Sequence, residues 1–204
     1  EMYWKYGYDR YFDSFEHYYS LYQRRNLDLW AEYADGKVTK EELNRQRYLY
    51  PLEAVGAGDS TLAKAYERDA LTMIPTKSKL MPHAREVLEY LSGKYNLYIL
   101  SNGFKELQSH KMRSSGIDEY FKKVVLSDDI GILKPWPEIF HFALSTTQSE
   151  LNNSLMIGDS WENDIVGAAG VGMHQVFYNL SGRTDLPFAP TYQITDLKDL
   201  FNFL

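Results

Sequence analysis

The chain has 204 residues, of which 44% are hydrophobic and 25% charged, so it can bury one substantial core or two modest ones. Its net charge of −6 excludes a general attraction to nucleic acid polymers or anionic membranes, which favours small molecules as partners. The absence of cysteine excludes disulfides, thiolate metal sites and cysteine nucleophiles and favours a cytoplasmic location, and no apolar run approaches the ~20 residues that span a bilayer.

Residues 1–77 carry helical periodicity and almost no strand pattern, and we expect a bundle of three to four helices there. Thr39 and Glu42 have the spacing of a capping box, and we expect the helix that follows to end at Pro51. Apolar and aromatic side chains recur at helical spacing at Phe12, Phe15, Tyr19, Tyr22, Leu27, Trp30 and Tyr33. For the tyrosines this spacing favours core or interface packing over a stacking platform for a base or sugar.

Residues 78–204 alternate helical patterns with short apolar runs, as in a parallel sheet with crossover helices. The expected strands are Leu97–Leu100, Val124–Leu126, Leu155–Ile157 and Gln175–Phe177. The fold class is therefore predicted as α/β, with a Rossmann-like parallel core in residues 78–204, an all-helical cap domain in residues 1–77 and a hinge near residues 75–80.

Two short segments suit a phosphate group. Ser101-Asn102-Gly103 follows a predicted strand, at the edge where open parallel sheets bind ligands. The Ser101 hydroxyl and the N–H groups of Asn102 and Gly103 can donate to phosphate oxygens, although such residues also make ordinary turns. Lys134-Pro135 precedes a predicted helix, and its ammonium suits a transferring phosphoryl group; an exposed structural lysine is the alternative.

The segment from Gly158 to Asp164 carries the strongest signal. Asp159 follows a predicted strand, and Asp164 falls in the first turn of the next helix, so the loop brings two carboxylates together. Hard oxygen ligands of this kind suit Mg²⁺. The alternative is that Asp159 caps the helix and Asp164 complements its dipole.

In this order, the three segments resemble the motifs of the haloacid dehalogenase superfamily, in particular its phosphatases with a helical cap, over essentially the whole chain. Asn26-Leu27, Leu29-Trp30 and the Gly36–Thr39 turn before Glu42-Leu43 are similar to the pyrimidine 5′-nucleotidase subgroup. The resemblance implies a Mg²⁺-dependent phosphatase of small phosphorylated metabolites, with nucleoside 5′-monophosphates the expected substrates, which acts through an aspartyl-phosphate.

The same resemblance implies residue roles. Ser101, Asn102 and Gly103 would bind the phosphoryl oxygens. Lys134 would clamp nucleophile and phosphate, and Asp159 would ligate Mg²⁺. Asp164, the second catalytic residue beside Lys134, would orient Lys134 or metal-bound water. The cap would close over the substrate and exclude bulk water.

One part of the family pattern has no match. The family places its nucleophile in an Asp-x-Asp-x-Thr-type motif at the end of the first, central strand. Here Asp128-Asp129 lies in a later loop, and Asp9 and Asp13 sit in a helical pattern. We expect this strand to belong to about 25 to 30 residues outside the sequence, and the 204 residues alone to fold poorly, because two strands would lack a neighbour.

Three other functions stay open. A non-catalytic relative that binds a phosphorylated ligand or a protein partner is favoured if the chain acts without a nucleophile. A dehalogenase attacks carbon and needs no metal, so the acid pair argues against it. A receiver-type phosphoacceptor places its metal-binding acids before the Ser and Lys, which is the reverse of the order here. The sequence predicts no oligomeric state.

Overall fold

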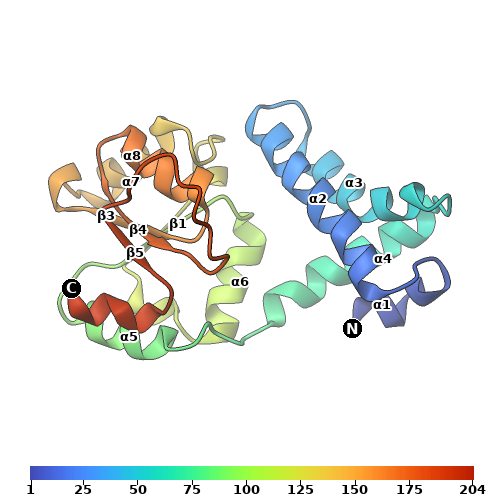
Figure 1. Ribbon diagram of the computed structural model, residues 1–204, viewed down its shortest axis with the longest axis horizontal. Helices are drawn as coiled ribbons and strands as arrows, with labels where there is room; N and C mark the ends of the chain where they lie inside the picture. Colours follow the sequence, from blue (N-terminus) through green and yellow to red (C-terminus); the bar gives the residue numbers. More distant parts are fainter. The chain divides into compact units, whose positions relative to one another are not determined.

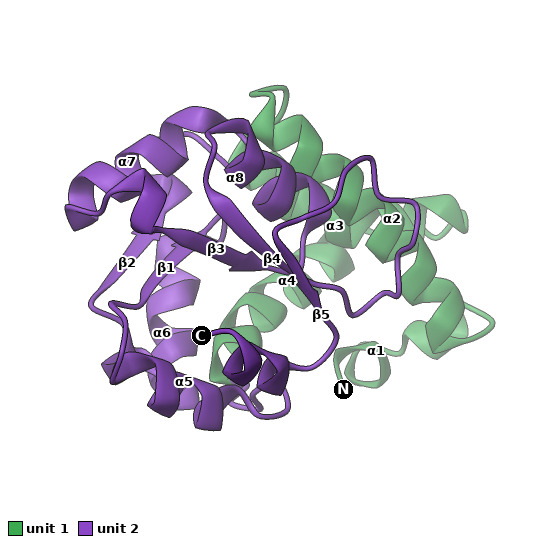
Figure 2. Ribbon diagram, turned by 60° about the vertical axis from the view of Figure 1, so that its left-hand side comes forward, with its two compact units in different colours: residues 1–76 green, residues 77–204 purple.

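A computed structural model describes residues 1–204 and divides into two compact units, Glu1–Thr76 and Lys77–Leu204 (Figure 1). Unit 1 is built from helices alone, and unit 2 contains every strand (Figure 2). The predicted α/β class is confirmed. No helix of the chain combines the length and the apolar character that crossing a bilayer requires.

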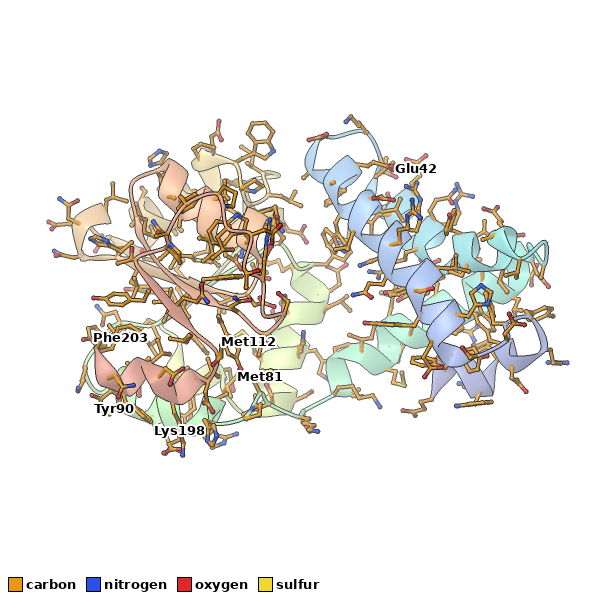
Figure 3. The ribbon with its side chains drawn as sticks, in the orientation of Figure 1. Glu42, Met81, Tyr90, Met112, Lys198 and Phe203 are labelled. Carbon is orange, nitrogen blue, oxygen red and sulfur yellow. The ribbon has the colours of Figure 1, made fainter.

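Three helices of unit 1, α2, α3 and α4, begin at polar side-chain caps. The Ser14 hydroxyl caps α2, and the Thr39–Glu42 capping box at the start of α3 is confirmed; Glu42 is labelled in Figure 3. Asp59 accepts two backbone N–H groups at the start of α4. The elements are α1 (Met2–Lys5), η1 (Tyr8–Arg10), α2 (Phe15–Ala34), α3 (Lys40–Ala54), α4 (Ser60–Met73) and η2 (Ile74–Thr76).

The expectation that Pro51 ends its helix is wrong, because α3 continues to Ala54. A proline inside a helix removes one hydrogen bond, but here Pro51 and Leu52 are both buried, and Leu52 belongs to the core of unit 1. Packing of this last turn therefore outweighs the lost bond. Of the tyrosines at helical spacing, Tyr22 packs against the core of unit 1 as predicted, whereas Tyr19 is exposed. Tyr8 and Tyr66 are buried in this core, and their rings stack at a centroid distance of 4.9 Å.

Unit 2 holds two all-parallel sheets, β1–β2 and β3–β4–β5. The strands are β1 (Tyr98–Ser101), β2 (Lys123–Leu126), β3 (Leu155–Gly158), β4 (His174–Tyr178) and β5 (Tyr192–Ile194). The helices are α5 (Ala84–Ser92), α6 (Lys105–Ser115), α7 (Pro137–Thr147), the π-helix η6 (Trp161–Val166) and α8 (Gly167–Gly170), with short 3₁₀ turns η3 (Asp118–Tyr120), η4 (Ser127–Asp129), η5 (Leu151–Asn153) and η7 (Leu197–Asn202). The four predicted strands are confirmed, and β5 is an additional one.

Helices cover both faces of these sheets (Figure 2). Leu155 and Ile157 of β3 pack toward α5 and η7, in a cluster that also contains Tyr90 and Phe203, both labelled in Figure 3. Met156 points to the opposite face, where it joins α7 and α8. This alternation is the two-residue period of a strand that packs against helices on both faces, and the side chains of β3 are half-buried.

The two sheets share a core but no hydrogen-bonded ladder. Leu100 of β1 and Met156 of β3 belong to the same apolar cluster under α7. However, β1 pairs only with β2, and β3 pairs only with β4. Each of these two strands therefore leaves one edge without a strand partner.

Candidate active site

Lys134 is the centre of the polar residues at the carboxyl ends of the strands. Its Nζ lies 2.6 Å from Asp164 Oδ1 and donates to the Leu100 carbonyl of β1 at 2.8 Å. The side chains of Lys134 and Asp164 are only 9% and 7% exposed. The alternative of an exposed structural lysine is therefore wrong, and one ammonium group links β1 to the turn that follows β3.

Asn102 fixes the backbone of Lys134. Its side-chain amide donates to the Lys134 carbonyl at 2.9 Å and accepts from the Lys134 N–H at 2.8 Å. Ser127 Oγ in turn donates to the Asn102 carbonyl at 3.3 Å. Two predicted segments 32 residues apart in the chain are thus joined by a pair of hydrogen bonds, and the Asn102 side chain is engaged with Lys134 in this structure.

The turn after β3 positions Asp164. Its Oδ2 accepts from the Ser160 N–H at 3.0 Å, while the Ser160 hydroxyl caps the helix by accepting from Asn163 N. The helix cap is therefore Ser160 and not Asp159. Gly158 leaves the space that this arrangement needs, because a Cβ there would overlap the Asp164 carboxyl group.

Asp159 is the predicted site acid whose carboxylate has no partner in the structure. It is exposed, immediately follows β3, and makes no hydrogen bond or ion pair. Mg²⁺ takes one or two carboxylates together with waters and phosphate oxygens, so Asp159 fits as one such ligand. The chain contains no cluster of three or more His, Cys, Asp or Glu side chains that could hold a metal by itself.

The Ser101 hydroxyl faces its own loop and α6. Ser101 Oγ accepts from the Gly103 N–H at 3.0 Å and from Gln108 Nε2 at 2.8 Å. The Gly103 N–H, which the sequence suggests for phosphate, therefore has a partner inside the loop. Gln108 is not predicted from the sequence; its only signal is its place as the fourth residue of α6, from which a side chain leans back toward the helix start.

Asp128 and Asp129 hold the neighbouring loop. Asp129 accepts from the Leu126 N–H at 2.9 Å and pairs with Lys105 at 3.3 Å, and Asp128 accepts from the Lys105 N–H. The bond from Leu126 and the charge of Lys105 lower the pKa of the Asp129 carboxyl group. These acids serve the fold of the loop after β2.

Taken together, this edge of unit 2 presents a buried cation, a hydroxyl group and a free carboxylate. A cation flanked by donors stabilises negative charge, and a free carboxylate attracts a hard cation. The arrangement suits a phosphorylated or carboxylated small molecule.

Comparisons with known proteins agree with this chemistry. The family model of haloacid dehalogenase-like hydrolases matches residues 3–172. The chain is 30% identical to the pyrimidine 5′-nucleotidase YjjG of Escherichia coli, over 90% of this chain and 80% of that protein. It is 29% identical to the HAD-hydrolase YfnB of Bacillus subtilis, over 90% of this chain and 78% of that protein.

The fold agrees as well. The crystal structure of magnesium-bound YfnB superposes with a TM-score of 0.83 at 28% identity, covering 92% of this chain and 82% of that chain. The L-2-haloacid dehalogenase of Xanthobacter autotrophicus shares the fold at 19% identity and a TM-score of 0.71, covering 91% of this chain and 84% of that chain. The resemblance to the superfamily and to its pyrimidine nucleotidases is confirmed, and the chain belongs to the haloacid dehalogenase-like hydrolase family.

Proposed function

We propose that this hydrolase is a Mg²⁺-dependent phosphatase of small phosphorylated metabolites. The observation that carries the proposal is the buried Lys134 ammonium group, which the Leu100 carbonyl of β1 and the Asp164 carboxylate hold, while Asn102 holds the Lys134 backbone. A phosphoryl group in transfer carries negative charge that such a preorganised cation stabilises. Relatives named as a pyrimidine 5′-nucleotidase and a phosphoserine phosphatase support the same chemistry.

In this proposal each residue has one task. Lys134 neutralises the phosphoryl group, Asp164 keeps the ammonium group in place, and the Ser101 hydroxyl donates to a phosphoryl oxygen. Asp159 supplies a carboxylate for Mg²⁺, and the ion, when bound, would neutralise charge on the phosphate. Asn102 acts through Lys134, whose backbone it holds.

The attacking carboxylate is proposed to come from a strand outside these 204 residues. β1 and β3 each have an unpaired edge, and Lys134 contacts groups on both sides, at Leu100 and Asp164. A strand paired with both edges would satisfy their backbone groups and would bring its own carboxyl end to Lys134. An Asp there would attack phosphorus to form an aspartyl-phosphate, which water then cleaves.

Nucleoside 5′-monophosphates are the proposed substrates. The support is the similarity to YjjG and to the pyrimidine 5′-nucleotidase PynA of Streptococcus pneumoniae, the latter 27% identical over 92% of this chain.

The test is phosphate release from a panel of nucleotides and sugar phosphates, with and without Mg²⁺. It compares the 204-residue chain with a chain extended upstream in its gene. We expect turnover from the extended chain alone, its loss in Asp159→Asn, and unchanged turnover in Asp118→Asn, an exposed acid before β2 at the other end of the strand. If neither chain turns over but both bind inorganic phosphate, the phosphatase proposal fails and a phosphate-binding protein replaces it.

A further inference from the structure

The Ser101 hydroxyl has no acceptor capacity left. A serine hydroxyl has one proton to donate and two lone pairs that accept. Gly103 N–H and Gln108 Nε2 donate to Ser101 Oγ at 3.0 and 2.8 Å, so both lone pairs are occupied. The single proton of Ser101 therefore points away from both donors, and this hydroxyl group acts only as a donor.

We propose that Gln108 is a positioning residue that makes Ser101 an obligate hydrogen-bond donor to a phosphoryl oxygen. This inference rests on the proposed function, and it adds a residue that acts on the phosphate through Ser101 without touching it. Phosphoryl oxygens are acceptors only, so a hydroxyl group whose lone pairs are already occupied is matched to them. A hydroxyl group that is free to rotate would also donate to other acceptors, so it would be less preorganised for the phosphoryl oxygen.

The loop is built to admit this contact. A Cβ at Gly103 would overlap the Gln108 amide, so glycine is what lets the amide reach Ser101. Gln108 lies three residues into α6 after Lys105, and its N–H donates to the Phe104 carbonyl, which fixes the start of the helix. The amide thus comes from a rigid element, and the hydroxyl group from the end of a strand.

The experiment measures the affinity of the upstream-extended chain, the one used in the turnover test, for inorganic phosphate by calorimetry in the presence of Mg²⁺. Gln108→Glu replaces the donor by an acceptor of the same shape, which would capture the Ser101 proton. Gln108→Met removes the donor but leaves the proton free. Each variant is made with Ser101 present and in the Ser101→Ala background, because the double-mutant cycle separates the effect on the hydroxyl group from the added charge of Glu.

We expect Ser101→Ala to weaken phosphate binding about tenfold, the size of one hydrogen bond to a charged group. With Ser101 present, Gln108→Glu should lower the affinity for phosphate about thirtyfold and Gln108→Met about threefold. In the Ser101→Ala background, Gln108→Glu should cost about threefold, its charge effect alone. Gly103→Ala, which displaces the amide, should resemble Gln108→Met.

The outcomes separate the two proposals. An equal cost of Gln108→Glu in both backgrounds overturns the role of Gln108. Phosphate binding by Gln108→Met that is tighter than in the parent also overturns it, since the amide oxygen of the parent would then have been accepting the Ser101 proton. Absence of phosphate binding by the unaltered chain, or no effect of Ser101→Ala, overturns the phosphate site itself and this inference with it. Circular dichroism and melting curves show that each variant is folded.

Discussion

Breaking the Lys134–Asp164 pair should cost unit 2 a large part of its stability. Both side chains are less than one-tenth exposed, and the Asp164 carboxylate accepts from Lys134 Nζ through one oxygen and from Ser160 N–H through the other. Asp164→Asn keeps the shape but offers one acceptor where two are needed, and it leaves the ammonium group with the Leu100 carbonyl alone. Removing one member of a buried ion pair costs about 3–5 kcal/mol.

The coupling free energy between Lys134 and Asp164, taken from a double-mutant cycle, tests the pairing more directly than either single variant does. Lys134→Met alone leaves the buried Asp164 carboxylate without its cation, whereas Lys134→Met combined with Asp164→Asn removes both charges. We expect the double variant to be about 2–3 kcal/mol more stable than the sum of the single costs. The control pair is Lys105 at the start of α6 and Asp129 in η4, whose side chains are 68% and 26% exposed. There we expect a coupling of about 0–1 kcal/mol that falls in 1 M salt, because exposed charges are screened.

The assay is urea unfolding followed by tryptophan fluorescence in a Trp4→Phe, Trp30→Phe background, which confines the signal to Trp136 and Trp161 of unit 2. Equal m-values across the cycle show that the same surface unfolds in each variant. A cost below about 1 kcal/mol for Asp164→Asn, with additive single variants, would refute the buried, paired arrangement on which the proposed site depends.

Three further predictions concern single positions. Tyr8→Phe should stabilise unit 1 by up to about 1 kcal/mol, because the buried Tyr8 hydroxyl has no partner, whereas Tyr18→Phe, which loses the bond to the Tyr66 hydroxyl, should destabilise it by a similar amount; melting followed by circular dichroism measures both. Gly158→Ala should cost about 1–3 kcal/mol by displacing Asp164, while Gly170→Ala, where a Cβ meets nothing, should stay within about 0.5 kcal/mol of the parent in urea unfolding. Because the pKa of Asp129 is lowered in the folded state, its carboxylate stabilises the fold at pH values above the unfolded pKa of about 3.9, and this contribution is lost as pH falls through the folded pKa. The difference in free energy of unfolding between the parent and Asp129→Asn should therefore shrink from pH 6 to pH 3. A difference that stays constant over this range would contradict the prediction.

The elements that the sequence predicts well are those whose signals are local. The capping box at Thr39 and Glu42 and the apolar runs of β1 to β4 depend on residues close together in the chain. β5 has no such signal, because Tyr192 and Gln193 are exposed and Ile194 alone is buried; its parallel pairing with β4 makes it a strand. The prediction that the helix ends at Pro51 is wrong because it also depends on tertiary contacts, which continue the helix past a residue that usually stops it.

The candidate site divides in the same way. Ser101, Lys134, Asp159 and Asp164 are found from residue type and from their positions after predicted strands or before predicted helices. The contacts that these residues make join positions about 30 residues apart in the chain, and no local pattern encodes such contacts. Lys134 contacts Leu100 and Asp164, and Asn102 holds the Lys134 backbone. Gln108 is missed because a glutamine near the start of a helix is usually a solvated side chain.

The contacts of Lys134 connect the fold of unit 2 to the candidate site. β1 and β3 share a core through Leu100 and Met156 but no backbone ladder, so the polar contact that crosses between their sheets is the Lys134 ammonium group. A buried ammonium group needs acceptors, and here the Leu100 carbonyl comes from β1 and the Asp164 carboxylate from η6, the helix that follows β3. A carboxylate brought to the same edge by a strand between them would meet this cation with its partners already in place. Electrostatic catalysis depends on such preorganisation, and under the proposed function the hydrogen bonds of Lys134 to Leu100 and Asp164 would provide it.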